Sequence, residues 1–492
     1  MKPDNFNHSP VTLTSLLETL KASRDFHLQA FTIAGKPFNL FYYSSLTDQT
    51  VFKKELLPCL RKAENSSLKE ITEAIPFIEA LIVKDVKKVE EKLLTGFLGL
   101  NLQGGTDECL LIPVKEQKHR DVTVPEVEFS VIGPKEGFIE DIDTNIYLIR
   151  KRLPVKNLIN SEIEVGSLSK TRVAVLYLDG IADEENVNTI KQRVEDIEFD
   201  HIDDSSYINQ LIEDNSKSPF PQLLDTERPD RTAASLTEGK VAVLVDGSPT
   251  AIIGPTTFLE FFSAFDDYFS NWIISSILRV IRVFSVAFSI FATAIYVAVL
   301  TYHTPLIPRD LLDTLVQSRD AIPFPPIIEA VFLELTIELL REAGARLPSK
   351  VGQTIGIVGG IVIGTAAVEA GLTSNVLLII VALSALASFT TPIYRIGNTI
   401  RLLRFPFLFA AQLWGLVGIF IGIGFLLVHL LGLTSLGRPY LEPLYPLRLQ
   451  DMKDSVIRLP FSRQSQRPVH MRPDNPKRFN KQQARKTRDI DD

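Results

Sequence analysis

The sequence has few cysteines and no recognisable secretion signal, and each shortage excludes a class of protein. Its 492 residues contain two cysteines, Cys59 and Cys109, too few for the disulfide framework of a small secreted domain. We expect both to be reduced thiols in a cytoplasmic domain. Residues 1–25 lack the apolar stretch of a signal peptide, and nothing resembles a translocation signal before about residue 283. The first half is therefore expected to stay on the cytoplasmic side.

The sequence also lacks the residue patterns of common catalytic sites. The phosphate-binding loop Gly-x-x-x-x-Gly-Lys-Ser/Thr, the zinc motif His-Glu-x-x-His and the nucleophile motif Gly-x-Ser-x-Gly are all missing. The seven histidines are scattered, without the close spacing of metal ligands. We therefore expect no enzyme activity, no metal and no cofactor.

What the sequence does contain is a charged half followed by an apolar half. Residues 1–270 carry charge throughout, whereas residues 283–433 include long stretches with almost none. The length requires more than one domain. The formal net charge of −7 averages two unlike halves, so it says little about partners, and no nucleic-acid partner is expected.

The first half predicts an N-terminal helix at 1–25 and two α/β subdomains, at 26–118 and 119–260. In the first subdomain we expect the following elements: a strand–turn–strand unit at 29–43, helices at 47–63 and 67–75, and strands at 92–101 and 108–114. In the second we expect helices at 140–152, 185–195 and 204–214, alternating with buried strands at 172–178 and 241–245. The expected fold is an α/β cytoplasmic N-terminal domain with two subdomains, followed by an α-helical transmembrane domain.

The transmembrane domain is expected at 283–433. The apolar segments long enough to cross a bilayer are 283–303, 355–372, 376–394 and 406–433, the last long enough to tilt or break. A further segment, 325–343, carries several glutamates and is predicted to be re-entrant or spanning. An aromatic interfacial helix is expected just before the first span, at 261–282.

The number of crossings stays open, because two charge rules conflict. The C-terminal tail at 434–492 is basic and is predicted to be cytoplasmic and partly disordered, so the number of crossings must be even. Four crossings place the basic loop 395–404 outside, whereas five place that loop inside and the tail outside. We favour four crossings, with 325–343 as a re-entrant or interior helix.

A glycine series marks one candidate functional segment. Glycines at 352, 356, 360 and 364 are four residues apart and so share one helical face. Such a face serves either as a close helix–helix contact or as the wall of a narrow conduit with an apolar gate. The pore-lining candidates are Gly356, Gly360, Ile361, Val362 and Gly364.

An acidic series marks the second candidate. Glu334, Glu338 and Glu342 recur every four residues, and Glu369 ends another apolar segment. Ionisable groups at membrane depth usually face water, a partner or an ion path. The series therefore indicates either an interfacial helix with a solvated acidic face or a vestibule that attracts cations. Arg341 is three residues from Glu338 and is predicted to pair with it. The ion-path or gate candidates are Glu334, Glu338, Glu369 and Arg341.

Several ordered blocks of sequence resemble one family. They are Gly133-Pro134-Lys135-Glu136-Gly137-Phe138-Ile139-Glu140, Ser218-Pro219-Phe220-Pro221-Gln222, Thr226 to Asp230, Val241 to Pro249, Ile322 to Pro326, Glu338 to Gly344, Gly352 to Gly356, and Asp454 to Pro460. Together they resemble the A subunit of GerA-type spore germinant receptors over about 125–462, and more loosely over 26–118. One departure is Asp141-Ile142-Asp143, where many relatives are more basic.

The resemblance implies a role in the inner spore membrane, with the N-terminal domain on the core side. It implies a transporter-like B subunit that senses the nutrient, a lipoprotein C subunit, and a homo-oligomeric ring that releases monovalent cations. Two alternatives stay open. One is a scaffold that assembles the receptor without conducting, and the other is an accessory ion-release protein like stage V sporulation protein AF.

Overall fold

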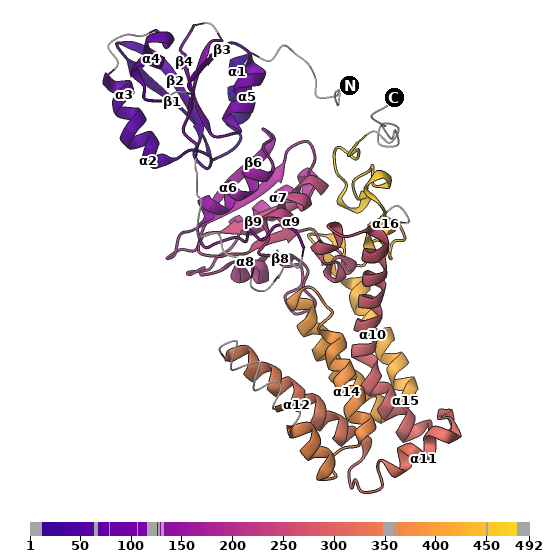
Figure 1. Ribbon diagram of the computed structural model, residues 1–492. Coiled ribbons are helices and arrows are strands. Elements are labelled where there is room, and N and C mark those ends of the chain that lie inside the picture. Colours follow the sequence, from indigo (N-terminus) through magenta and orange to yellow (C-terminus); the bar gives the residue numbers. More distant parts are fainter. Residues whose placement is uncertain are drawn as a thin grey trace, which may run out of the picture.

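The structure is a computed structural model in which two α/β units stand above a bundle of helices (Figure 1). It describes residues 12–62, 67–77, 79–105, 107–115, 125, 128, 132–347, 359–360, 362–448 and 451–479. The predicted fold class, an α/β half followed by an α-helical half, is confirmed.

The first unit is a five-stranded antiparallel sheet with helices on both faces. Its strands lie in the order β1-β2-β4-β5-β3, with the bounds Phe26–Ile33 (β1), Lys36–Tyr43 (β2), Leu81–Val83 (β3), Phe97–Leu102 (β4) and Cys109–Pro113 (β5). One face is covered by α1 (Leu13–Leu20) and α5 (Val86–Leu93). The other is covered by α2 (Gln49–Val51), the π-helical turn η1 (Phe52–Leu56), α3 (Leu57–Lys62) and α4 (Leu68–Ala74).

The second unit repeats this architecture. Its antiparallel strands lie in the order β6-β7-β9-β10-β8, with the bounds Leu158–Val165 (β6), Thr171–Leu178 (β7), Leu224–Thr226 (β8), Val241–Val245 (β9) and Ala251–Gly254 (β10). One face packs against α6 (Ile142–Arg152) and α9 (Pro229–Glu238), the other against α7 (Glu184–Glu195) and α8 (Ser205–Ile212). Alternate residues of β9 enter the two cores, which explains its continuous apolar sequence.

The predictions for these units are mostly confirmed, with local corrections. The hairpin turn is confirmed, because Ile33 pairs with Lys36 and both intervening residues have positive φ. The strand predicted at 92–101 starts only at Phe97, because residues 86–93 form α5, whose first turn is capped by Asp85. Strands β3, β6, β8 and β10 were not predicted, since they are short or rich in polar residues. Of the predicted start of the second subdomain, residues 119–124, 126–127 and 129–131 lie outside the described residues.

A buried ion pair joins the two units. Nitrogens of Arg150 lie 2.5 and 2.6 Å from the two carboxylate oxygens of Asp25. The hydroxyls of Ser23 and Ser45 donate to the same carboxylate. Burial raises the pKa of Asp25, but Arg150 and the two hydroxyls outweigh it and hold the pKa below its ordinary value. The carboxylate therefore stays charged inside the interface between the units.

The helical half contains α10 (Trp272–Tyr302), α11 (Arg309–Gln317), α12 (Pro326–Arg346), a helical stretch at 362–369, α14 (Asn375–Ser388) and α15 (Tyr394–Gly432). Of these, α10, α14 and α15 run side by side, α12 is inclined to them and α11 lies across the end far from the α/β units (Figure 1). Among the described residues, α10 and α15 have the length and apolar composition of membrane-crossing helices, and α14 is apolar but shorter. The segment predicted at 325–343 is the continuous helix α12, and the start of the span predicted at 355–372 lies outside the described residues.

The span predicted at 406–433 is not a single helix. It comprises the end of the first arm and the whole second arm of a helical hairpin. α15 begins at Tyr394 and breaks at Gly415, where φ is 60° and ψ is −141°. A side chain could not be placed there, because a Cβ at Gly415 would lie 2.8 Å from Nε2 of His303. The two arms pack against each other, since a Cβ at Gly422 would lie 2.7 Å from the Phe407 ring. α15 therefore runs the length of the bundle twice.

Both ends of this hairpin lie against the second α/β unit. Arg395, at the start of the first arm, lies 2.7 Å from the carboxylate of Asp225. His429, near the end of the second arm, lies 2.9 Å from the hydroxyl of Ser218. The favoured four-crossing arrangement put the basic segment 395–404 on the far side from the α/β domain, whereas the structure places Arg395 against that domain. The break at Gly415 divides the predicted single span between two antiparallel arms.

One further prediction needs correction. The interfacial helix expected at 261–282 is two 3₁₀ turns, η2 (Phe258–Phe262) and η3 (Phe265–Tyr268), followed by the start of α10. Phe261 and Phe262 are buried in the core of the second unit, so they are not free to form the outer face of a helix.

The described parts of the C-terminal tail pack on the second unit and on the start of α10 (Figure 1). It contains β11 (Thr434–Ser435), β12 (Arg438–Pro439), α16 (Met452–Ser455), η5 (Phe461–Arg463) and η6 (Val469–Met471). Arg438 lies 2.9 Å from Asp183, and Arg478 lies 2.8 Å from Glu238. These basic side chains therefore pair with acids of the protein. Residues 480–492 of the predicted disordered tail lie outside the described residues.

Candidate functional site

The acidic residues of α12 lie at successive levels of the bundle, and Glu334 occupies the middle one. Its carboxylate lies 3.0 Å from a guanidinium nitrogen of Arg404 on α15 and accepts a 2.8 Å hydrogen bond from Thr293 on α10. Both charged side chains are at most 5% exposed. Arg404 also donates to the Ser289 hydroxyl at 2.6 Å and to the Ser384 carbonyl at 3.0 Å. This cluster ties four helices together inside an apolar bundle.

Glu338 lies one turn further along α12, toward the α/β units. Its carboxylate lies 3.3 Å from Arg401 and 3.5 Å from Arg341, so the predicted Glu338–Arg341 pair is confirmed. Arg341 also donates to the Ser388 hydroxyl at 3.2 Å and lies over the Phe389 ring. This level is more open, since the Glu338 side chain is 42% exposed.

A third acidic residue, Glu329, lies at the far end of the bundle and is completely buried. It lies 2.9 Å from Arg319 and accepts a hydrogen bond from the Ser374 amide at 3.1 Å. The predicted acidic stripe is therefore a ladder of acid–arginine pairs. Each carboxylate is compensated by an arginine, so a cation would find a net attraction only where a pair separates.

The predicted glycine segment is described only in part. Gly356 and Ile361 lie outside the described residues. A Cβ at Gly360 would meet no atom within 4 Å, and one at Gly364 would be in ordinary contact with Leu378. Val362 is 55% exposed. Gly360 and Val362 thus face away from their own bundle, whereas Gly364 lies against α14.

Glu369 is the fourth acidic candidate, and the structure does not bring it to the ladder. It is an exposed residue at the end of the 362–369 helical stretch. The ladder itself contains arginines that sequence reasoning did not single out, chiefly Arg401 and Arg404. The available signal was the presence of these arginines next to a long apolar segment. Residues 395–404 were instead interpreted as a basic loop that indicates a side of the membrane.

The loop 218–222 connects the second unit to the bundle. The carbonyl of Pro219 accepts a hydrogen bond from Thr399 on the first arm of α15, and the Ser218 hydroxyl contacts His429 on the second. The carbonyl of Pro221 accepts from the Tyr440 hydroxyl at 2.7 Å. A groove of about 270 Å³ lies beside this loop, and it is lined by Glu213, Ser218, Pro219, Phe220, Pro221, Arg395, Asn398, Thr399 and Leu402. The loop of the second unit therefore contacts both arms of α15.

Within the described part of the chain, no group of three or more His, Cys, Asp or Glu side chains is arranged to hold a metal ion. Cys59 and Cys109 are free thiols, as expected. The polar groups described inside the bundle are therefore acid–arginine pairs, hydroxyls and backbone carbonyls.

Comparison with known proteins identifies the family to which this architecture belongs. Residues 14–470 match the family described as Bacillus/Clostridium GerA spore germination protein. The chain is 49% identical to spore germination protein GerQA of Bacillus cereus over 486 residues, which cover 99% of this chain and 97% of that protein. It is 39% identical to spore germination protein A1 of Bacillus subtilis (strain 168) over 450 residues, 91% of this chain and 93% of that protein.

One solved structure is similar to part of the chain. It is the N-terminal domain of the A subunit of the Bacillus megaterium spore germinant receptor GerK3, 26% identical, with a TM-score of 0.38. The match covers 50% of this chain and 94% of that domain. Because the family match and the two sequence similarities each extend over nine-tenths or more of the chain, this protein belongs to the GerA family of spore germination proteins.

Proposed function

We propose that this protein is the A subunit of a nutrient germinant receptor in the inner spore membrane, and that its bundle forms part of a gated path for monovalent cations. The observation that carries the proposal is the ladder of buried acid–arginine pairs, centred on Glu334 and Arg404, inside a bundle that otherwise consists of apolar helices. Ionisable groups at such positions are costly and are typical of ion and proton paths.

The outer surface of the bundle supports a membrane location. Phe284, Phe420, Phe425 and Val428 are between 69% and 74% exposed, which is typical of a surface that faces lipid. The proposed topology has six passes, through α10, α12, the predicted span 355–372, α14 and the two arms of α15. Six passes put both α/β units, the tail and the basic segment 395–404 on one side, the cytoplasmic side by the positive-inside rule.

The exposed glycine segment supports a path formed between copies of the chain. In a ring, the residues that line a central path face away from their own bundle, as Gly360 and Val362 do. The pore-lining set proposed for the ring is Gly356, Gly360, Ile361, Val362 and Gly364, with Glu369 at one end. A transporter-like B subunit and a lipoprotein C subunit complete the proposed receptor, and nutrient sensing is assigned to the B subunit.

A non-conducting scaffold is the second candidate, and one observation favours it. Glu334 and Glu338 both have arginine partners, so the ladder stabilises the bundle without attracting cations as long as the pairs stay closed. In that case the chain would hold the receptor together and the ions would pass elsewhere.

Potassium release from spores that carry Val362→Ala separates the two functions. If Val362 lines an apolar constriction, the smaller side chain makes release leaky without nutrient or roughly severalfold faster with it. Val428→Ala is the matched control, because Val428 is equally apolar and 69% exposed but lies on α15. Unchanged release at normal protein levels would move the path out of this segment and favour the scaffold.

A further inference from the structure

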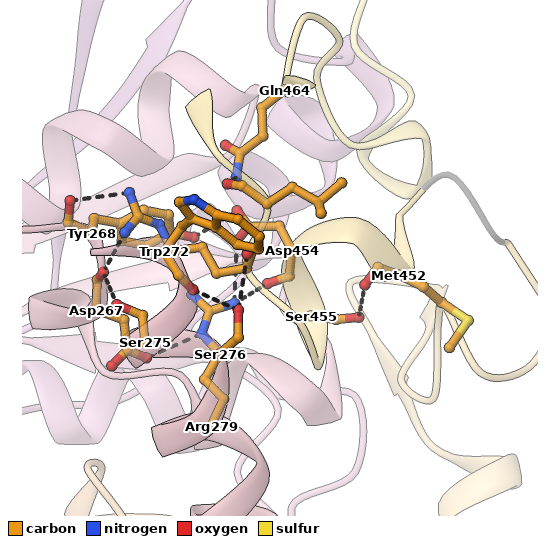
Figure 2. Close-up of polar contacts among 12 residues, drawn as sticks. Asp267, Tyr268, Trp272, Ser275, Ser276, Arg279, Met452, Asp454, Ser455 and Gln464 are labelled. Atoms are coloured by element: carbon orange, nitrogen blue, oxygen red, sulfur yellow. Dashed lines mark hydrogen bonds and ion pairs between the residues drawn. The ribbon is translucent and has the colours of Figure 1, made fainter. Parts of the chain in front are cut away.

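Residues 451–463, here called the strap, lie across the start of α10 (Figure 2). Arg458 is the buried residue among the described side chains of the strap. Its guanidinium donates to the main-chain carbonyls of Asp267 at 2.8 Å, Ser270 at 2.7 Å and Tyr268 at 3.2 Å. These carbonyls lie at the end of the 3₁₀ turn η3 and just after it, immediately before α10 begins. A single side chain from the far end of the sequence therefore fixes the joint between the second unit and the first helix of the bundle.

The strap also holds α10 itself. The hydroxyl of Ser276 donates to the carbonyl of Arg458 at 3.0 Å, and a guanidinium nitrogen of Arg279 lies 3.1 Å from the carboxylate of Asp454. Tyr268 donates its hydroxyl to the same carboxylate at 2.8 Å. Figure 2 shows these side chains converging between the strap and the first turns of α10. The strap thus bonds to both sides of the joint.

The charges in this cluster depend on one another. The guanidinium groups of Arg279, Arg282 and Arg458 face two carboxylates, Asp267 and Asp454, together with main-chain carbonyls. Arg279 and Arg458 are at most 3% exposed, and buried charges of this kind are costly unless they are paired. Removing the strap would leave the carbonyls of Tyr268 and Ser270 without the Arg458 donor and Arg279 with one acidic partner fewer, while the Asp267 carbonyl would keep the Ser275 hydroxyl as a donor.

We infer that the strap makes the second α/β unit and the first turns of α10 one rigid body, and that Arg458 is the positioning residue of this coupling. The inference rests on the proposed function, because it assigns the strap a role in transmitting movement of the α/β unit to the bundle. The loop 218–222 acts on the two arms of α15, and the strap acts on α10. Through these two contacts, one rigid-body movement of the second unit would reach α10 and both arms of α15.

Hydrogen exchange of the purified full-length protein tests the rigid joint directly. Arg458→Ala should speed exchange in peptides covering 267–276 and 452–460 at least tenfold, whereas peptides covering β9 should keep their protection and so report intact folding. Arg458→Lys keeps the charge and a single donor nitrogen, and should give an intermediate increase in the exchange rate. Arg472→Ala is the matched control, because Arg472 lies in the same tail and is 61% exposed, 3.8 Å from Glu185. Unchanged exchange in Arg458→Ala would overturn the inference.

Germination of spores carrying the same variants tests the coupling. Arg458→Ala should lower the rate of nutrient-triggered ion release at least fivefold, at normal protein level and with an unchanged nutrient concentration for half-maximal response. Arg458→Lys should recover part of the rate, and Arg472→Ala should match the wild type. A normal rate, or release without nutrient, would contradict a coupling role. If the receptor proves not to conduct at all, the exchange result still decides whether the strap rigidifies the joint.

Discussion

At the scale of single residues, the account depends on a carboxylate and a guanidinium that are 70 residues apart in sequence and meet at the centre of the bundle. Glu334 was identified from its spacing, but its partner Arg404 was not, because periodicity along one helix carries no information on which neighbouring helix lies opposite. The same limit applies to Glu329 and Arg319. By contrast, Glu338 and Arg341 lie within one helix, so their pairing could be predicted from spacing.

Neutralising Glu334 should destabilise the protein strongly. Glu334→Gln leaves Arg404 buried without its counterion, which costs roughly 3–5 kcal/mol in comparable buried pairs. The matched control is Glu342→Gln on the same helix, where the carboxylate is 62% exposed and its partner Arg346 is 78% exposed. The control should change the free energy of unfolding by less than about 1 kcal/mol. Denaturation of the detergent-purified protein measures both effects.

A double variant checks the reason for this effect. Glu334→Gln with Arg404→Met removes both charges and should recover much of the loss, because no unpaired charge remains in the bundle. Equal destabilisation by Glu334→Gln and Glu342→Gln would show that the buried pair has no special part in holding the helices.

At the scale of elements, the sequence predicted most of what is locally determined. The hairpin of β1 and β2, the buried strands β7 and β9, and the apolar part of α10 all follow from residue pattern. The hairpin in α15 does not, because Gly415 is one of several glycines in an apolar run and only the approach of His303 singles it out. The packing of the tail was missed for a similar reason, since its basic residues and their acidic partners are each typical of solvated surface.

His470, a buried contact of the tail, should make stability depend on pH. Its imidazole lies 3.2 Å from Asp451 and 3.6 Å from Glu260, which also pairs with Lys240. Burial lowers the pKa of His470, but its hydrogen bond with Asp451 and the nearby charge of Glu260 outweigh this and raise the pKa from 6.5 to about 9. The stabilisation is therefore complete below about pH 6.5 and is lost as the pH rises through 9, with a total on the order of 2–3 kcal/mol.

Thermal unfolding at pH 6 and pH 9.5 measures this effect. The wild type should lose stability between the two values, and His470→Gln should remove most of the difference. His201→Gln is the control, because His201 is 61% exposed and lies 3.8 Å from Asp203, so its substitution should leave the pH profile unchanged. A profile that His470→Gln leaves intact would assign the pH dependence to another group.

At the scale of the whole molecule, the sequence established the order of parts and the family, but not how the parts meet. The α/β half and the apolar half are evident from charge distribution alone. The hairpin was missed because, in the sequence, its two arms joined at Gly415 look like one long apolar span. The contacts that connect the halves, the loop 218–222 and the strap, involve residues about 180 positions or more apart in sequence, and no local pattern predicts them.

The measurement that tests the central claim most directly is nutrient-triggered potassium efflux from liposomes containing this chain with its B and C partners. The account predicts efflux that requires nutrient, that becomes leaky or faster with Val362→Ala, and that keeps its wild-type behaviour with Val428→Ala. Liposomes in which the assembled receptor still binds nutrient but releases no potassium above the level of protein-free liposomes would contradict it.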